Sequence, residues 1–410
     1  MVFHETKVAL AVRQDVVAYA FTTLLSRAQP FLEALVLTAL LSVEDFGAWS
    51  WAGGLYLGVA AVTHGGLPAA VLRYAAASPH EGPALLRYAL CRALPWMGLS
   101  LVLLGAVGWT VPRLVGLLAW CHLPALAAFL PAEILRAYLR GRYENRALAW
   151  WQLTTTVVSV GLLSGAAAWK GLWGAACVRL LQPIWLLGFG AWPLRAAWRA
   201  PQRRFPGLSR FGWHALWGNL ALEATFLLPT WLLGWRTGDP ILIAYWRWAT
   251  LLPLNLRQLF TQAVMYNYPR WVQSPEPVLT LWRRWRLLLW GLAGLVMAGA
   301  ALWLPLWERY PGLAYAPARP YYGLALLVAW LWSTDALLLP NLLSAKGHIY
   351  AYSRAYAWGL LSAIPLYSVA GSSLLGYLGA LAIAALTAAF TAYLSLRKKP
   401  TFFCNMPESP

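Results

Sequence analysis

A small set of charged side chains falls within stretches of the chain that are otherwise apolar. A charge inside a membrane is costly, so each of these residues is expected to face a partner or a water-filled cavity. Arginine suits binding of phosphate or carboxylate groups, whereas a carboxylate can exchange a proton or attract a cation. These residues are therefore candidates for binding or coupling roles, with structural ion pairs or hydrogen bonds as the alternative. Its members are Arg27, Glu33, Arg179, Glu223, Arg247, Arg257 and Asp335.

Four of these charges and two tryptophans form the predicted substrate-binding group. Arg27 lies about twelve residues into its apolar run, which corresponds to a depth of about 18 Å. Arg257 lies near the end of its run, where it could instead extend to the membrane surface. Tryptophan rings could stack on sugars, although anchoring at the interface is the alternative. The group is Arg27, Arg247, Arg257, Glu223, Trp217 and Trp246.

Asp335 and Glu33 are the candidates for coupling transport to H⁺ or Na⁺. No basic residue lies within one helical turn of Asp335, and burial of an unpaired carboxylate favours its protonated form. A structural hydrogen bond to another helix is the alternative for Asp335. Glu133 is expected to pair locally with Arg136 three residues later. His64 is expected to be a packed polar group rather than a proton carrier.

Signals for cofactors and metals are missing from the sequence. The four cysteines are scattered without CxxC spacing, which indicates neither a disulfide framework nor a metal site. There is no GxxxxGK[ST] segment, so direct hydrolysis of ATP is not expected. We expect no cofactor, no metal and no catalytic residue.

The elements that must position these residues are membrane-spanning helices. The chain has 410 residues, of which 60% are apolar and only 11% charged. Such a composition is typical of an all-α polytopic membrane protein. Twelve apolar runs are long enough to cross the hydrocarbon core. They are residues 15–41, 46–72, 84–109, 112–138, 147–169, 171–192, 210–235, 240–264, 284–307, 320–342, 348–369 and 373–396.

The basic residues between these runs predict the orientation. Most lie on the side that holds both termini, while the opposite side has only Arg113, Lys170, Arg236, Arg309 and Arg319. The positive-inside rule then places both termini in the cytoplasm of a multi-pass protein of the inner (plasma) membrane. The net charge of +18 thus indicates topology rather than a nucleic-acid partner. The N-terminus lacks the features of a removable signal peptide.

A basic, proline-containing segment divides the chain. We predict a six-helix bundle in residues 1–192, a cytoplasmic linker in 193–210, a second six-helix bundle in 211–400 and a cytoplasmic tail in 401–410. Similar glycines at Gly141 and Gly347 support an internal repeat. Halves with an even number of helices are related by a pseudo-two-fold axis along the membrane normal and enclose a cleft. Aligning the halves places Arg27 opposite Glu223.

Several short motifs resemble the polysaccharide and lipid-linked oligosaccharide flippases of the multidrug/oligosaccharidyl-lipid/polysaccharide exporter superfamily. They are the turn Leu41–Gly47, Gly65-Gly66-Leu67, Leu72-Arg73-Tyr74, the fourth-helix end Leu135–Gly141, the turn Gly171–Ala175, Ala244-Tyr245 after Asp239, and Tyr268-Pro269-Arg270. The chain departs from that pattern at Ile243, where glycine is common, and in its many tryptophans.

The resemblance implies two bundles that form a V and open alternately to either face. It implies a polyprenyl-pyrophosphate-linked oligosaccharide as cargo, moved to the outer leaflet for cell-surface polysaccharide biosynthesis. The implied partners are membrane lipids, H⁺ or Na⁺ as coupling ion, and a glycan polymerase or glycosyltransferases. Arg27 follows Ser26 as in a cavity-facing pair of related lipid II flippases.

Two other functions remain open. A cation-coupled multidrug exporter of the same superfamily would share the fold, although arginines in the cleft would repel cationic drugs. A membrane-embedded glycosyltransferase would place a carboxylate such as Glu44 or Asp45 in the first outer loop. That loop is short here, and such enzymes need a long one, so we do not expect an enzyme.

Overall fold

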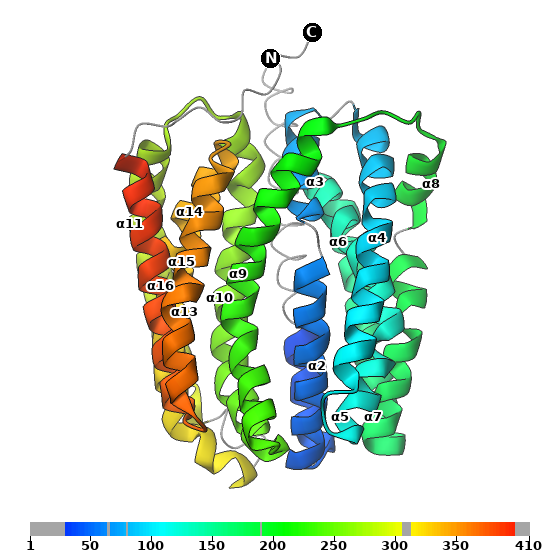
Figure 1. Ribbon diagram of the computed structural model, residues 1–410, viewed down its shortest axis with the longest axis vertical. Coiled ribbons are helices and arrows are strands. Elements are labelled where there is room, and N and C mark those ends of the chain that lie inside the picture. Colours follow the sequence, from blue (N-terminus) through cyan, green and yellow to red (C-terminus); the bar gives the residue numbers. More distant parts are fainter. Residues whose placement is uncertain (1–28, 64–65, 79–80, 189–190, 306–312, 398–410) are drawn as a thin grey trace, which may run out of the picture.

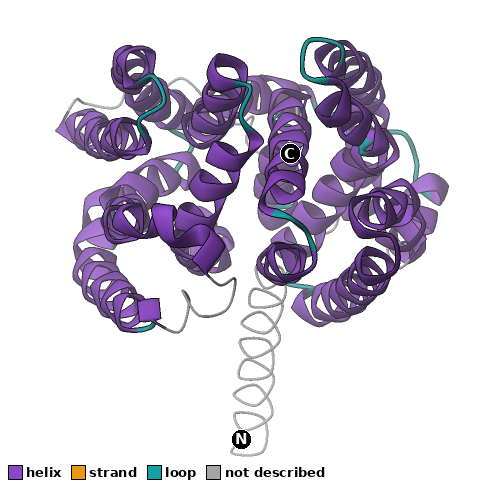
Figure 2. Cartoon of the chain, turned by 90° about the horizontal axis from the view of Figure 1, so that it is seen from below, coloured by secondary structure: helices purple, strands orange, loops and turns teal. Residues whose placement is uncertain are grey.

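All regular structure in the described part of the chain is helical. The computed structural model describes residues 29–63, 66–78, 81–188, 191–305 and 313–397. Within these ranges the elements are α-helices and one short 3-10 helix. Figures 1 and 2 show them as two helical bundles that lie side by side. The predicted all-α architecture with two bundles is therefore confirmed.

The first described helix of the N-terminal bundle is Gln29–Leu40. The other helices are α2 (Val43–Thr63), α3 (Leu67–Ala77), α4 (Gly82–Gly108), α5 (Arg113–Cys121), α6 (Leu123–Gly141), α7 (Asn145–Gly188) and α8 (Ala191–Arg199).

The C-terminal bundle begins at the helix that follows the basic linker. Its elements are α9 (Pro206–Thr237), α10 (Pro240–Gln273), α11 (Val278–Leu302), η2 (Leu313–Ala318), α13 (Arg319–Ser333), α14 (Asp335–Ala345), α15 (Ile349–Ala370) and α16 (Leu374–Arg397). We call the end of the molecule where α3, α6, α10 and α14 end the basic end, and the other the opposite end; they are the top and bottom of Figure 1.

Several predicted runs are broken or joined. Among the described helices, five are long and apolar enough to cross a membrane, or seven if each of two bent pairs counts as one span. The run 112–138 is split into α5 and α6, bent by 44°, and the run 320–342 is broken at Thr334. Conversely, α7 covers two predicted runs and leaves helical geometry only at Lys170 and Gly171. Hydropathy locates these spans because it averages over many residues, and for the same reason it misses single-residue breaks.

A tight turn joins α9 to α10. Gly238 has a φ of 63°, in the left-handed region that glycine adopts without strain. The Asp239 side chain then accepts a hydrogen bond of 2.8 Å from the backbone N–H of Ile241 and caps α10. Pro240 occupies the first turn, where a helix does not need its N–H. The turn holds α9 and α10 together as one wall of the C-terminal bundle.

The two bundles meet where α2 lies against α9 and α10, and where α3 lies against α9. Glycines allow this close approach at the opposite end. A Cβ on Gly47 would overlap the backbone carbonyl of Pro240, and one on Gly234 would overlap the Trp51 indole. Small residues at helix interfaces bring backbones together in just this way within membranes.

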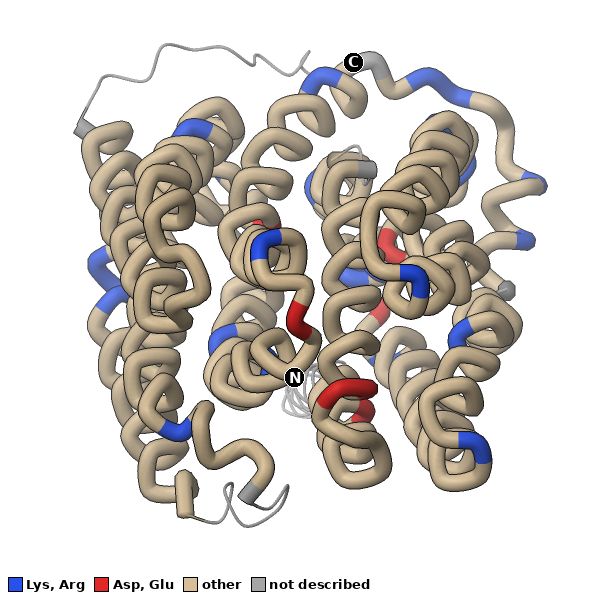
Figure 3. The backbone as a smooth tube through the Cα atoms, turned by 60° about the horizontal axis from the view of Figure 1, so that its bottom comes forward, with Lys and Arg blue, Asp and Glu red and all other residues tan. Residues whose placement is uncertain are grey.

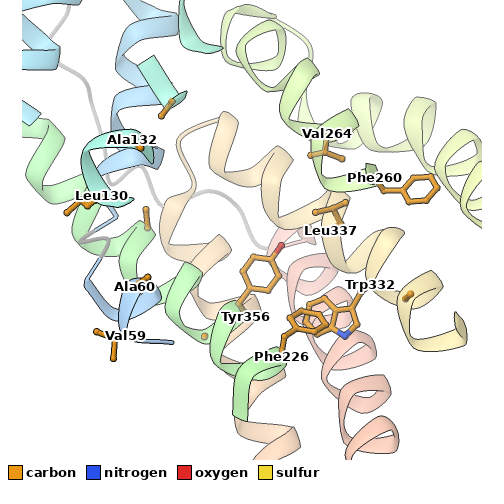
Figure 4. Packing of buried hydrophobic residues seen from close by; sticks show 14 of the residues in the cluster. Val59, Ala60, Leu130, Ala132, Phe226, Phe260, Val264, Trp332, Leu337 and Tyr356 are labelled. Atoms are coloured by element: carbon orange, nitrogen blue, oxygen red, sulfur yellow. The ribbon is translucent and has the colours of Figure 1, made fainter. Parts of the chain in front are cut away.

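Aromatic side chains fill the interior of the C-terminal bundle. Figure 4 shows Phe226, Trp332 and Tyr356 packed against one another from α9, α13 and α15. The ring centres of Phe226 and Trp332 are 4.9 Å apart, and those of Trp332 and Tyr356 are 6.3 Å apart. Buried charged side chains of the C-terminal bundle pack against this aromatic cluster.

Candidate functional site

A cavity of about 180 Å³ lies between the two bundles, toward the basic end. Both bundles contribute to its wall, through α3 and α6 on one side and α9, α10, α14 and α15 on the other. Its lining residues are Pro68, Ala69, Leu72, Glu133, Ala137, Arg140, Ala215, Asn219, Met265, Tyr268, Asn341, Ser344, Ile349 and Tyr352. A cavity with this double lining changes shape whenever the bundles move relative to each other.

The charges on the cavity wall are unequal. Glu133 forms an ion pair with Arg136, which agrees with the local pairing predicted from the sequence. Arg140, one turn further along α6, has no ion-pair or hydrogen-bond partner among the described residues, and its Nε is buried. Among the described residues, the N-terminal bundle therefore presents a neutralised carboxylate and an unpaired guanidinium to the cavity.

The C-terminal bundle supplies neutral polar groups. The Tyr352 hydroxyl donates a hydrogen bond to Oδ1 of Asn219, and the hydroxyls of Tyr268 and Ser344 are 3.0 Å apart. Asn341 bonds through its Nδ2 to the backbone carbonyl of Leu337 at 2.7 Å. Amides and hydroxyls of this kind can donate to or accept from a bound solute.

Glu223 and Arg257 lie behind this wall, deeper in the C-terminal bundle. Arg257 is only 5% exposed, and its guanidinium carbon lies 4.0 Å from the centre of the Phe226 ring. It interacts electrostatically with Glu223 and with Tyr356. Neither Glu223 nor Arg257 lies at the cavity surface in this conformation, and their contact with substrate stays a prediction.

Glu33 is held in a buried ion pair of the N-terminal bundle. Its Oε2 accepts a hydrogen bond of 2.6 Å from Arg179, while Gln29 donates to its Oε1 at 3.0 Å. Arg179 also donates to Gln182 and lies over the Trp49 ring, 5.4 Å from its centre. A carboxylate that is already neutralised by an arginine has less need of a proton or a metal cation. The coupling role predicted for Glu33 stays a prediction. It would have to operate in the presence of the ion pair with Arg179.

Asp335 is not an isolated carboxylate. It accepts a hydrogen bond of 2.9 Å from the Trp282 indole, and its Oδ2 lies 3.4 Å from Nε of Arg286. Both partners are on α11. The alternative predicted for Asp335, a structural hydrogen bond to another helix, is observed, and its charged partner comes from that helix too. A coupling role for Asp335 stays a prediction.

The remaining predicted residues lie away from the cavity or outside the description. Trp217 is 49% exposed and contacts Trp213, and Trp246 is 3% exposed and packs on Tyr377. Neither lines the cavity, and neither does Arg247, which is half-buried in α10. Arg27 and His64 lie outside the described residues, as does the predicted juxtaposition of Arg27 with Glu223.

Two hydrogen-bonding contacts join the bundles at the basic end, and together we call them the clasp. Arg73 of α3 donates to the backbone carbonyls of Ser344 and Ala345, at 3.1 and 2.6 Å, at the end of α14. In return, Gln273 of α10 donates to the carbonyl of Ala76 at 3.1 Å, at the end of α3. The last carbonyls of a helix have no partner within it, so a donor from the other bundle satisfies them. The clasp stands beside the cavity, because Ser344 belongs to both.

The sequence interpretation missed the cavity residues that carry the polarity. Arg140 was assigned to the basic loops, because it lies at the end of an apolar run. Asn219 and Asn341 are single amides within apolar runs. That position was the only feature of the sequence that could have marked them as cavity residues. Tyr268 and Tyr352 cannot be told from interfacial tyrosines without knowing which way they point.

Comparisons with known proteins identify the fold. No family model and no curated protein matches the chain. Among solved structures, the inward-facing conformation of a multidrug resistance MATE family transporter of the MOP superfamily matches with a TM-score of 0.67 and 14% identity, over 93% of this chain and 97% of that one. An outward-facing conformation of such a transporter matches with a TM-score of 0.63 and 15% identity, over 93% and 94%.

A transporter of the same superfamily from Pyrococcus furiosus also matches, with a TM-score of 0.62 and 13% identity, over 93% of this chain and 95% of that one. Its binding pocket is described as having reverse polarity, which is taken to suggest a different function. At these identities the likeness shows the fold alone, and membership of the superfamily expected from the sequence stays a prediction. The likeness does not support the finer assignment to polysaccharide flippases.

Proposed function

We propose that this protein is a membrane transporter that carries an amphiphilic solute by alternating access. The observation that carries the proposal is the cavity that both bundles line, with the clasp beside it. Rocking of one bundle against the other would open such a cavity to one side at a time. The match of the same fold to both an inward-facing and an outward-facing transporter supports this mechanism.

Export of amphiphilic compounds, in the manner of a multidrug transporter, is the substrate class that the structural likeness favours. The cavity adds a constraint on charge. With Glu133 neutralised by Arg136 and Arg140 unpaired, a cationic solute would meet net repulsion and an anionic one would gain a charge-assisted hydrogen bond. The reversed pocket of the Pyrococcus furiosus transporter is a precedent for different pocket polarities on this fold.

Flipping of a polyprenyl-pyrophosphate-linked oligosaccharide is the second candidate. The same unpaired Arg140 favours it, because guanidinium binds phosphate oxygens well. A cavity of about 180 Å³ is too small for an oligosaccharide, so this function requires a much wider conformation. We also propose H⁺ or Na⁺ as the coupling ion, a location in the plasma membrane, and enzymes of glycan synthesis as partners. The fold alone decides none of these points.

Transport in proteoliposomes tests the proposal. Vesicles containing the purified protein should take up an anionic amphiphilic dye faster than protein-free vesicles and faster than a cationic dye of similar size. Arg140→Gln should reduce uptake of the anionic dye about tenfold, the effect of a lost charged hydrogen bond. The control is Arg283→Gln, which removes an exposed arginine away from the cavity.

Preferential uptake of the cationic dye would overturn the assignment of charge. Uptake of neither dye, together with scrambling of a fluorescent polyprenyl-pyrophosphate sugar, would favour the flippase.

A further inference from the structure

The short helix α8 differs from every spanning helix around it. It has nine residues, Ala191–Arg199, and packs on α4. Ala197 and Pro193 face inward and are buried. Trp192 and Trp198 face outward, and they are 67% and 57% exposed. A two-faced helix with tryptophans on its open side is typical of a segment that lies at a membrane interface.

Arginines share the open side of α8 with the tryptophans. Arg195 and Arg199 are exposed, as are Arg203 and Arg204 just beyond the helix. Of these four, Arg203 pairs with Glu81, and the other three have no acidic partner among the described residues. Figure 3 shows the blue positions of this segment along the edge of the molecule, and residues 191–210 contain no Asp or Glu.

The site of this segment suggests what it contacts. It lies at the outer edge of the N-terminal bundle, at the basic end and beside α4, as Figure 1 shows. The helix α4 is long and apolar enough to cross a membrane, and only 22% of its most apolar stretch is buried within the protein. The exposed apolar side of α4 would therefore face lipid. The helix α8 packs beside the first turns of α4, where a spanning helix would meet the lipid headgroups.

We propose that α8 and residues 200–204 form a docking surface for anionic phospholipid headgroups. Guanidinium groups bind phosphate through paired hydrogen bonds, and basic clusters beside a spanning helix attract anionic lipid. The indoles of Trp192 and Trp198 would lie among the glycerol groups and hold the helix in the plane of the interface. Since this segment links the two bundles, the lipid would fix the N-terminal side of the linker.

Positive residues at this end also serve topology. Topology alone requires no preference among lipids, so the two interpretations differ in a measurable way. The proposal is independent of the transported solute, because it concerns a surface remote from the cavity.

Native mass spectrometry of the delipidated full-length protein in detergent tests the proposal. With equal amounts of phosphatidylglycerol and phosphatidylcholine, the wild type should retain several-fold more of the anionic lipid. Arg195→Gln combined with Arg199→Gln should lower that ratio at least threefold. The matched control is Arg283→Gln with Arg284→Gln, which removes the same charge from exposed positions on α11 and should leave the ratio near that of the wild type.

A second measurement locates the lipid and also guards against misfolding. Trp198→Cys, in a background without other cysteines, would carry a fluorophore whose emission should be quenched more by brominated phosphatidylglycerol than by brominated phosphatidylcholine. Equal quenching by both lipids, or none by either, would overturn the proposal. So would an equal loss of anionic lipid in the α8 variant and in its control.

Discussion

The two ends of the interface between the bundles are held together by different forces. At the opposite end, α2 packs on α9 and α10 through glycine contacts such as Gly47 on Pro240 and Gly234 on Trp51. At the basic end, the clasp consists of hydrogen bonds from Arg73 and Gln273 to backbone carbonyls of the other bundle. The opposite end depends on shape, whereas the basic end combines close packing, such as Gly66 on the Gly212 carbonyl, with polar contacts that water can replace.

This difference predicts which end opens more readily. A hydrogen bond to a helix-end carbonyl has a net value of about 0.5–1.5 kcal/mol, because water can satisfy both groups when the bond breaks. Separating interlocked backbones and indole rings loses many van der Waals contacts at once and gains no such compensation. In the conformation described here, we expect the basic end to open first and the opposite end to act as the pivot.

The largest effect is expected from Gly47→Ala. The added methyl group would collide with a backbone carbonyl, which cannot rotate away as a side chain can, so overpacking should lower the free energy of unfolding by about 1–3 kcal/mol. Thermal unfolding in detergent measures this loss. The control is Gly53→Ala on the same helix, where a Cβ meets nothing within 4 Å. If both variants melt at the same temperature, the close packing at the opposite end is not stabilising.

Arg73→Gln should open the basic end without unfolding the protein. Loss of the charged donor to Ser344 and Ala345 should raise the population of the open state about tenfold. The labelling rate of Ala137→Cys, which lines the cavity, by a polar maleimide reports that population. Arg92→Gln, on the outer side of α4, is the matched control. An unchanged labelling rate would show that the clasp does not close the cavity.

Acidification should weaken the same end to a lesser degree. Burial, together with the charge of nearby Arg73, lowers the pKa of His348 below its ordinary value of 6.5. The closed state therefore takes up a proton less readily than the open one, and stability is lost as the pH falls below 6.5 toward the lowered pKa. Labelling of Ala137→Cys should rise a few-fold between pH 7 and pH 5, after correction for thiol reactivity. In His348→Gln the rise should vanish; a rise that persists would assign the pH effect to another group.

The smallest effect is expected from Gln273→Ala. The bond to Ala76 is a single neutral hydrogen bond, so its loss should increase labelling by about two- to fivefold. The double variant with Arg73→Gln tells whether the two contacts act together. Additive effects indicate two independent contacts, whereas a double variant no more open than Arg73→Gln alone indicates one cooperative clasp.

The architecture could be predicted because it depends on averages. Long apolar runs, a basic linker at mid-chain and glycines near turns predict two helical bundles without any knowledge of contacts. The ion pair of Glu133 with Arg136 was also predictable, since both residues lie within one helical turn.

The site depends on contacts between helices, which one sequence does not reveal. Glu33 meets Arg179, and Asp335 meets Trp282 and Arg286, across large separations in the chain. Arg140 was overlooked for the converse reason, because a basic residue at the end of a run has an ordinary topological explanation. Trp217 and Trp246 lie on helices of the C-terminal bundle but do not line the cavity, so their contact with substrate stays a prediction.

The last turn of α14 carries both a cavity wall and a clasp. Asn341 and Ser344 line the cavity, while the carbonyls of Ser344 and Ala345 accept from Arg73. Occupancy and closure are then thermodynamically linked, and the linkage is reciprocal. A solute that binds the closed form more tightly must hold the basic end shut by the same free energy. Conversely, any substitution that loosens the clasp must weaken the apparent affinity for that solute, even if it never touches it.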